Sequence, residues 1–350
     1  MIQNIQALRG VAAGLVFLIH VLRPNMGADW LVYKMWWVGP AGVDLFFVIS
    51  GFIVSLTAVR AATADPSAPV AALKFAAKRL LRIFPLYWIV LTGALLADGH
   101  VELAPAWLPQ MPMWRLVTLM TIDNNKVLLA WTLAYELLFY AVLSLIISWF
   151  PRRVFQALGW WLVGSVAAVM IAMGHGTQYF EFLPASPLML EFGAGCVVAY
   201  LTQQGVKAWG KSALVVGIIL FGVAAWTHSQ FGNWQPAFRV VFAFPCALIV
   251  YGAVTVEEAG LTAPKWLQRL GDASYSIYIW HQLVVGCALV AFESLGLVKA
   301  LPGVVVLVLA GGIALGVGFA SYRFIEKPLQ NWVGRTIRSS RPEAQTASAT

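Results

Sequence analysis

Long apolar runs alternate with short polar connections along almost the whole chain. Each run approaches or exceeds the ~20 residues that an α-helix needs to cross the hydrocarbon core of a bilayer. The runs lie at 5–22, 40–59, 82–98, 130–149, 158–174, 187–203, 212–228, 236–255, 273–293 and 301–321. The pattern predicts an all-α integral membrane protein, built as a bundle of about ten transmembrane helices.

The composition favours the same class of protein. Of the 350 residues, 60% are hydrophobic and 11% are charged, and the mean hydropathy is +0.78. A soluble domain is nearer to ~45–50% apolar and ~25% charged residues. We therefore expect one transmembrane domain at 1–330, followed by a polar cytoplasmic tail without regular structure at 331–350.

Lys and Arg residues are distributed unequally between the connections on the two sides. If the N-terminus is cytoplasmic, the basic residues of the external segments are Arg23, Lys34, Arg115, Lys126, Arg239 and Lys299. All the others except Arg9 then fall in cytoplasmic segments, as the positive-inside rule requires. This bias predicts a multi-pass protein with both termini cytoplasmic. It also accounts for most of the net charge of +8, which therefore does not indicate a nucleic-acid partner.

Ionisable side chains inside the apolar runs are candidates for function, because burying them in hydrocarbon is costly. Arg9 and His20 are eleven positions apart in the first run. Helical geometry places them within about 20° of the same face and about 16 Å apart along the axis. In one interpretation, Arg9 is an anchor whose charged end reaches the membrane surface, and His20 makes a hydrogen bond between helices. In the other, both side chains act on a substrate.

Other polar groups inside the runs are arranged by depth. The carboxylates and histidines at middle and outer depths are His20, Asp44, Glu136, Glu191 and His281. The arginines nearer the cytoplasmic side are Arg9, Arg79 and Arg82. Arg offers a bidentate fork to phosphate, and His suits acid–base or acyl chemistry near neutral pH. The offset between Arg9 and His20 is similar to the reach of the pantetheine arm of coenzyme A.

Six segments resemble, in order, the motifs of the acyltransferase family 3 membrane proteins. They read "ALRGVAAGLVFLIH", "GVDLFFVISGFIV", "KRLLRIFPLYW", "AWTLAYELLFY", "GDASYSIYIWH" and "YRFIEKPL". The chain is most similar to the exopolysaccharide acetyltransferases of that family. The resemblance implies an enzyme of the bacterial plasma (inner) membrane that uses cytoplasmic acetyl-CoA as acyl donor. The implied acceptor is a hydroxyl on a glycan or lipid-linked oligosaccharide, with polysaccharide biosynthesis machinery as a further candidate partner.

The resemblance also implies roles for individual residues. Arg9, Arg79 and Arg82 match the arginines that would hold the coenzyme A phosphates, although Arg79 and Arg82 could instead be topology anchors. His20 would be the catalytic base, or would itself carry the acyl group. Glu136 would orient His20, as the carboxylate of a triad does, unless it only makes a hydrogen bond between helices. No metal is expected.

Three further residues are candidates for binding the acceptor. Asp44 either holds the acceptor or caps the second span. Ser50 either packs together with Gly51 or donates to an oxyanion. His281 shares a helix face with Tyr275 and Tyr278, which either lines the cavity or packs.

Other functions remain open at this point. Polar groups at mid-depth also suit a secondary transporter or flippase, but such proteins often carry paired repeats with broken helices, and the sequence shows neither. A subunit of an export complex would have no need of Arg9 and His20. The enzyme could also use succinyl-CoA or a longer acyl donor. For the acetyltransferase we expect a central cavity that opens inward to the donor, with a second opening towards the outer face.

Overall fold

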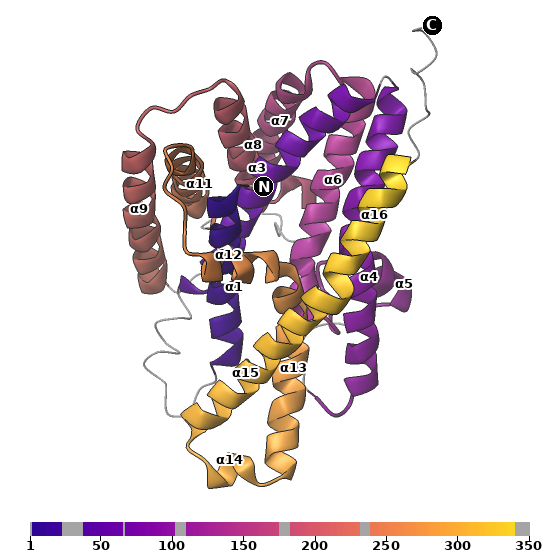
Figure 1. The fold of residues 1–350 in the computed structure, drawn as a ribbon, viewed down its shortest axis with the longest axis vertical. Coiled ribbons are helices and arrows are strands. Elements are labelled where there is room, and N and C mark those ends of the chain that lie inside the picture. The colour runs from indigo at the N-terminus through magenta and orange to yellow at the C-terminus, as the bar shows by residue number, and fades with distance from the viewer. Residues whose placement is uncertain are drawn as a thin grey trace, which may run out of the picture.

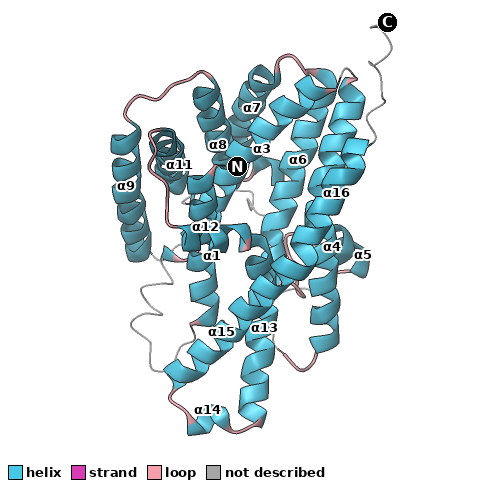
Figure 2. Ribbon diagram, viewed as in Figure 1, coloured by secondary structure: helices cyan, strands magenta, loops and turns pink. Residues whose placement is uncertain are grey.

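A computed structural model describes residues 2–22, 38–65, 67–101, 110–174, 183–231 and 239–339. Within these ranges the chain folds into helices joined by short connections, and no strand occurs (Figure 2). Nine helical segments of the described chain are long and apolar enough to cross a membrane, and one further apolar helix is shorter. The predicted all-α, multi-span membrane protein is confirmed.

The long helices follow the predicted runs closely. They are α1 (Gln3–Val21), α3 (Ala41–Ala64), α4 (Ala68–Ala97), α6 (Trp131–Trp149), α7 (Val154–Gly174), α9 (Gly210–Phe231), α11 (Ala243–Glu258), α13 (Ser274–Ser294) and α15 (Gly303–Ser321). The shorter apolar helix is α8 (Leu188–Gln203).

Short elements connect these helices. They are α5 (Met113–Thr118), η1 (Leu128–Ala130), η2 (Leu183–Ala185), η3 (Val240–Phe242), α12 (Lys265–Asp272) and α14 (Leu297–Ala300). The π-helical turn η4 (Tyr322–Glu326) joins α15 to α16 (Lys327–Ser339), so that α15 and α16 form one continuous rod (Figure 1).

Two predicted boundaries are wrong. The run predicted at 82–98 belongs to a helix that already begins at Ala68, with a proline in its first turn. Proline is favoured there because its missing N–H would be unpaired anyway. The tail predicted to be irregular from 331 is helical as far as Ser339, because α16 continues the rod. Residues 340–350 lie outside the described part of the chain.

Helix α3 is the centre of the packing. It contacts α1, α4, α6, α7, α8 and α11. Its closest neighbour is α8, because two glycines allow the backbones to meet. A Cβ added at Gly51 would lie 2.1 Å from the carbonyl oxygen of Phe192, and one at Gly195 would lie 2.1 Å from that of Val48. Small residues permit such close approach of helices in membranes.

Peripheral helices expose apolar side chains where a bilayer would contact them. On α7 these include Trp160, Val163, Met170 and Ile171. On α9 they include Val215, Ile218, Ile219 and Trp226. Helices α1, α3, α4, α6 and α13 pack against one another and place the candidate site among them.

Candidate functional site

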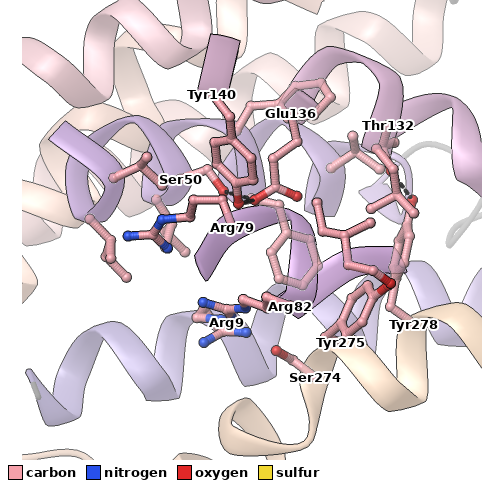
Figure 3. A pocket seen from close by; sticks show the side chains of 18 residues that line it. Arg9, Ser50, Arg79, Arg82, Thr132, Glu136, Tyr140, Ser274, Tyr275 and Tyr278 are labelled. Atoms are coloured by element: carbon pink, nitrogen blue, oxygen red, sulfur yellow. Dashed lines mark hydrogen bonds between the residues drawn. The ribbon is translucent and has the colours of Figure 1, made fainter. Parts of the chain in front are cut away.

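A pocket lies among α1, α3, α4, α6 and α13, and we call it the arginine pocket (Figure 3). The polar side chains that line it are Arg9, Ser50, Arg79, Arg82, Thr132, Glu136, Tyr140, Ser274, Tyr275 and Tyr278. Apolar residues, mainly of α3, complete the wall. The pocket is narrow, with a volume of about 90 Å³ for the centres of water-sized molecules. It therefore admits an extended chain more readily than a ring system.

Three arginines give the pocket its charge. The guanidinium groups of Arg9 and Arg82 lie side by side, close enough to repel each other (Figure 3). Arg79 donates a hydrogen bond to Thr57 and lies over the ring of Tyr140. In the described part of the chain, no carboxylate forms a salt bridge with any of the three. An anion that entered the pocket would relieve this repulsion.

Arg82 differs from the other two arginines. The side chain of Arg9 donates to Gln6 at 3.0 Å, and that of Arg79 is held by Thr57. No hydrogen bond or ion pair joins the Arg82 side chain to the described residues, although the side chain is half-buried. Its five N–H donors are thus available to a ligand.

Glu136 is the acidic residue that lines the arginine pocket, and it accepts a hydrogen bond from another helix, which is one of the two alternatives that the sequence left open. Ser50 donates to its carboxylate at 3.3 Å, and the hydroxyl of Tyr140 donates to the same oxygen. The predicted contact with His20 is absent from the hydrogen bonds of Glu136 in the described structure. Tyr140 was missed by the sequence argument, although its place four residues after Glu136 puts it on the same helix face.

His20 and His281 form a pair outside the arginine pocket. Their ring centroids are 5.1 Å apart, with the rings at 66° to each other. The Nδ1 atom of His20 lies 2.7 Å from the carbonyl oxygen of Val16, and that of His281 lies 3.1 Å from the carbonyl oxygen of Ile277. A carbonyl oxygen can only accept, so each neutral ring carries its hydrogen on Nδ1 and its lone pair on Nε2. The atom that can act as base or nucleophile is therefore Nε2.

Tyr278 lies between the pocket and the histidine pair. Its ring lines the arginine pocket, and its centroid is 6.2 Å from that of His281. The hydroxyl groups of Tyr278 and Thr132 are hydrogen-bonded at 3.0 Å. The predicted common face of α13 therefore exists: Tyr275 and Tyr278 face the pocket, and His281 lies one turn further along the helix. His281 itself is completely buried, and its Nε2 has no hydrogen-bond partner among the described residues.

Asp44 lies in a different polar cluster and is completely buried. Arg239 donates to its two carboxylate oxygens at 3.1 and 3.0 Å. The guanidinium group of Arg239 also lies over the ring of Trp131, at 5.6 Å from its centroid. The buried carboxylate of Glu191 has no hydrogen-bond partner among the described residues. Arg239 was missed because the sequence places it in an external segment, where a single basic residue is usual.

No group of three His, Cys, Asp or Glu side chains in the described ranges is placed to hold a metal ion. The chemistry that these residues can support uses arginines as anion ligands and an imidazole as base or nucleophile.

Comparison with known proteins identifies the family. The profile of the acyltransferase domain matches residues 2–323. The chain belongs to this acyltransferase family. Both the predicted family and the predicted type of enzyme are confirmed, and the protein is a multi-pass membrane acyltransferase.

Three relatives of this acyltransferase show the range of the family. The exopolysaccharide production protein ExoZ of Rhizobium meliloti (strain 1021) is 29% identical over 308 residues, which are 83% of this chain and 90% of the relative. The acyltransferase MdmB of Streptomyces mycarofaciens is 25% identical, over 81% of this chain and 78% of the relative. The O-acetyltransferase OatA of Staphylococcus aureus (strain NCTC 8325 / PS 47) is 23% identical, over 89% of this chain and 55% of the relative. No solved structure matches the acyltransferase.

Proposed function

We propose that this acyltransferase moves an acetyl group from cytoplasmic acetyl-CoA to a hydroxyl of an exported or cell-surface glycan. The protein would lie in the bacterial plasma membrane, with both of its termini in the cytoplasm. The names of ExoZ and OatA support the polysaccharide acceptor and the acetyl group, respectively. Association with polysaccharide biosynthesis machinery fits the same reaction.

The observation that carries the proposal is a narrow pocket with three arginines, none of which forms an ion pair with the described residues. Coenzyme A is an anion at its nucleotide end and an extended, neutral arm at its thioester end. Arg9, Arg79 and Arg82 would bind its phosphates, because guanidinium groups form strong, charge-assisted hydrogen bonds with them. The arm would then run along α1 towards His20, which lies about 16 Å from Arg9 by helical rise.

His20 would supply the reactive atom at the thioester. In the direct route, the acceptor oxygen attacks the thioester carbon while Nε2 of His20 takes the hydroxyl proton. The carbon–sulfur bond breaks, and the coenzyme A thiolate then takes that proton. In the covalent route, Nε2 attacks the thioester carbon, the carbon–sulfur bond breaks and the coenzyme A thiolate leaves. The acceptor oxygen then attacks the acyl carbon, the bond from that carbon to Nε2 breaks, and the hydroxyl proton passes by way of Nε2 to the thiolate. The hydrogen bond from Nδ1 to Val16 supports both routes, since it leaves the lone pair on Nε2.

Glu136 and Ser50 would act inside the arginine pocket rather than on His20 directly. The carboxylate reduces the repulsion among the three arginines while the pocket is empty, and its hydrogen bonds orient the hydroxyls of Ser50 and Tyr140. We assign Asp44 a structural role at the start of α3, because its carboxylate is already held by Arg239. His281 would support the His20 ring that it touches.

The test uses membranes that contain the protein, radiolabelled acetyl-CoA and crude surface glycan from the host. Label should enter the glycan with the wild type and not with His20→Ala, at equal protein levels. His100→Ala is a matched control, because His100 is exposed at the end of a loop. If His20→Ala labels the glycan as well as the wild type does, His20 takes no part in the acyl transfer. If coenzyme A is never released while the glycan still crosses the membrane, the protein is a transporter.

A further inference from the structure

A second cavity lies beside the arginine pocket, between the adjoining ends of α3 and α4. We call it the hairpin cavity, and its lining residues are Thr57, Arg60, Ala61, Ala64, Asp65, Ala71, Lys74, Phe75, Lys78 and Arg79. Its volume, measured in the same way, is about 680 Å³, against about 90 Å³ for the arginine pocket. Small-molecule sites commonly fall between ~300 and 1,000 Å³. The hairpin cavity is thus large enough for a nucleotide, whereas the arginine pocket is not.

The charge of the hairpin cavity is strongly positive. Four cationic side chains line it, from Arg60, Lys74, Lys78 and Arg79, together with the single carboxylate of Asp65. Asp65 forms an ion pair with Lys74 at 2.8 Å. One carboxylate cannot balance four cations, so the cavity as a whole favours a ligand with several negative charges.

Helix α4 connects the two cavities. Arg79 lines both of them. Lys74, Lys78 and Arg82 are spaced four residues apart, which places them in a row along one face of the helix. A ligand with phosphates at two positions could therefore contact this row at one end and the arginine pocket at the other.

Coenzyme A has this arrangement of charges. A pyrophosphate joins the pantetheine arm to the adenosine, and a separate phosphate is attached to the 3′ oxygen of the ribose. We propose that the hairpin cavity binds the 3′-phosphoadenosine end of coenzyme A, with the 3′-phosphate held by Lys74 and Lys78. Arg79 would meet the pyrophosphate at the junction, and the arm would continue into the arginine pocket. This proposal rests on the proposed function, because it requires a coenzyme A donor.

The test compares coenzyme A with dephospho-coenzyme A, which lacks only the 3′-phosphate. Both compete with radiolabelled acetyl-CoA for the purified, full-length protein in nanodiscs of neutral lipid. The wild type should bind coenzyme A about tenfold or more tightly than dephospho-coenzyme A, because charge-assisted hydrogen bonds to the 3′-phosphate are lost in the latter. In Lys78→Gln the affinity for coenzyme A should fall towards that for dephospho-coenzyme A, while the affinity for dephospho-coenzyme A stays unchanged.

Lys207→Gln is the matched control, because Lys207 is an exposed lysine outside both cavities. This variant should keep the wild-type preference for coenzyme A. Lys78 is also exposed, so a folding defect is not expected from its substitution. A second variant, Lys74→Gln, should reduce the same preference and leave the binding of dephospho-coenzyme A intact.

Three results would overturn the proposal. Equal wild-type affinity for the two compounds would refute the 3′-phosphate site, but it would not contradict acetyl-CoA as the donor. A uniform loss of affinity for both compounds in Lys78→Gln would assign the lysine a general electrostatic role. The experiment is repeated in nanodiscs that contain anionic lipid. If this lipid abolishes the preference for coenzyme A over dephospho-coenzyme A, and Lys78→Gln reduces only the amount of bound lipid, the cations bind lipid phosphates instead. Failure of both compounds to bind would refute the proposed function itself.

Discussion

Replacing Arg82 by Gln should weaken donor binding without destabilising the empty protein. The Arg82 side chain has no hydrogen bond or ion pair with the described residues, so its removal leaves no partner unsatisfied. It also removes one of the two neighbouring cations that repel each other, Arg82 and Arg9. Removing Arg82 also removes its attraction to the carboxylates of Glu136 and Glu326, so the temperature of thermal unfolding without ligand should change little.

The expected loss of affinity for acetyl-CoA follows from the hydrogen bond between Arg82 and phosphate that the substitution removes. A hydrogen bond to a charged group contributes about 1.5–3 kcal/mol. Because 1.4 kcal/mol corresponds to a tenfold change in Kd, Arg82→Gln should bind acetyl-CoA roughly 10- to 150-fold more weakly. A bidentate contact with a phosphate would place the effect near the upper end of this range.

Two measurements on one preparation check the prediction. Equilibrium binding of radiolabelled acetyl-CoA gives Kd, and thermal unfolding in detergent without ligand gives the stability of the empty state. Arg152→Gln is the control, because Arg152 is exposed and lies outside the arginine pocket. An unchanged Kd in Arg82→Gln would refute the role of the pocket as donor site. A marked fall in the unfolding temperature would show that Arg82 has a structural partner.

Three further predictions concern packing and the histidine pair. Arg239→Ala would leave Asp44 buried and unpaired, which should cost about 3–5 kcal/mol and lower the unfolding temperature; an unchanged temperature would argue against a buried ion pair. Gly51→Ala should accumulate poorly in membranes, because its Cβ would meet a backbone oxygen of α8 at 2.1 Å, whereas Gly222→Ala has open space and should accumulate normally. Equal accumulation would contradict the close crossing of α3 and α8. His281→Ala removes the ring that packs against His20, so kcat should fall roughly tenfold or more at normal protein levels; unchanged activity would show that His281 does not position His20.

The membrane spans could be predicted because hydrocarbon imposes a minimum length on each apolar run. The prediction is wrong at the start of α4, because Lys74 and Lys78 make the first half of this helix resemble a polar connection. These lysines are tolerated in the helix because they line the open hairpin cavity. Hydropathy alone does not distinguish a connection from a helix with one polar face.

The arginines and Glu136 of the candidate site could be found from the sequence, because buried charges are rare in membrane helices. The residues that these side chains bind could not be found from the sequence. Glu136 bonds to Ser50 and Tyr140, and Asp44 bonds to Arg239 across 195 positions of sequence. Such pairings depend on how the helices rotate and cross, and a single sequence does not encode them as a local pattern.

The most direct test of the donor site is an experimental structure of the protein with acetyl-CoA bound. We predict that the pyrophosphate contacts Arg79 and Arg82, with Arg9 alongside, and that the thioester carbon points towards Nε2 of His20. Acetyl-CoA bound away from these arginines, or with its thioester at the end far from His20, would contradict this prediction.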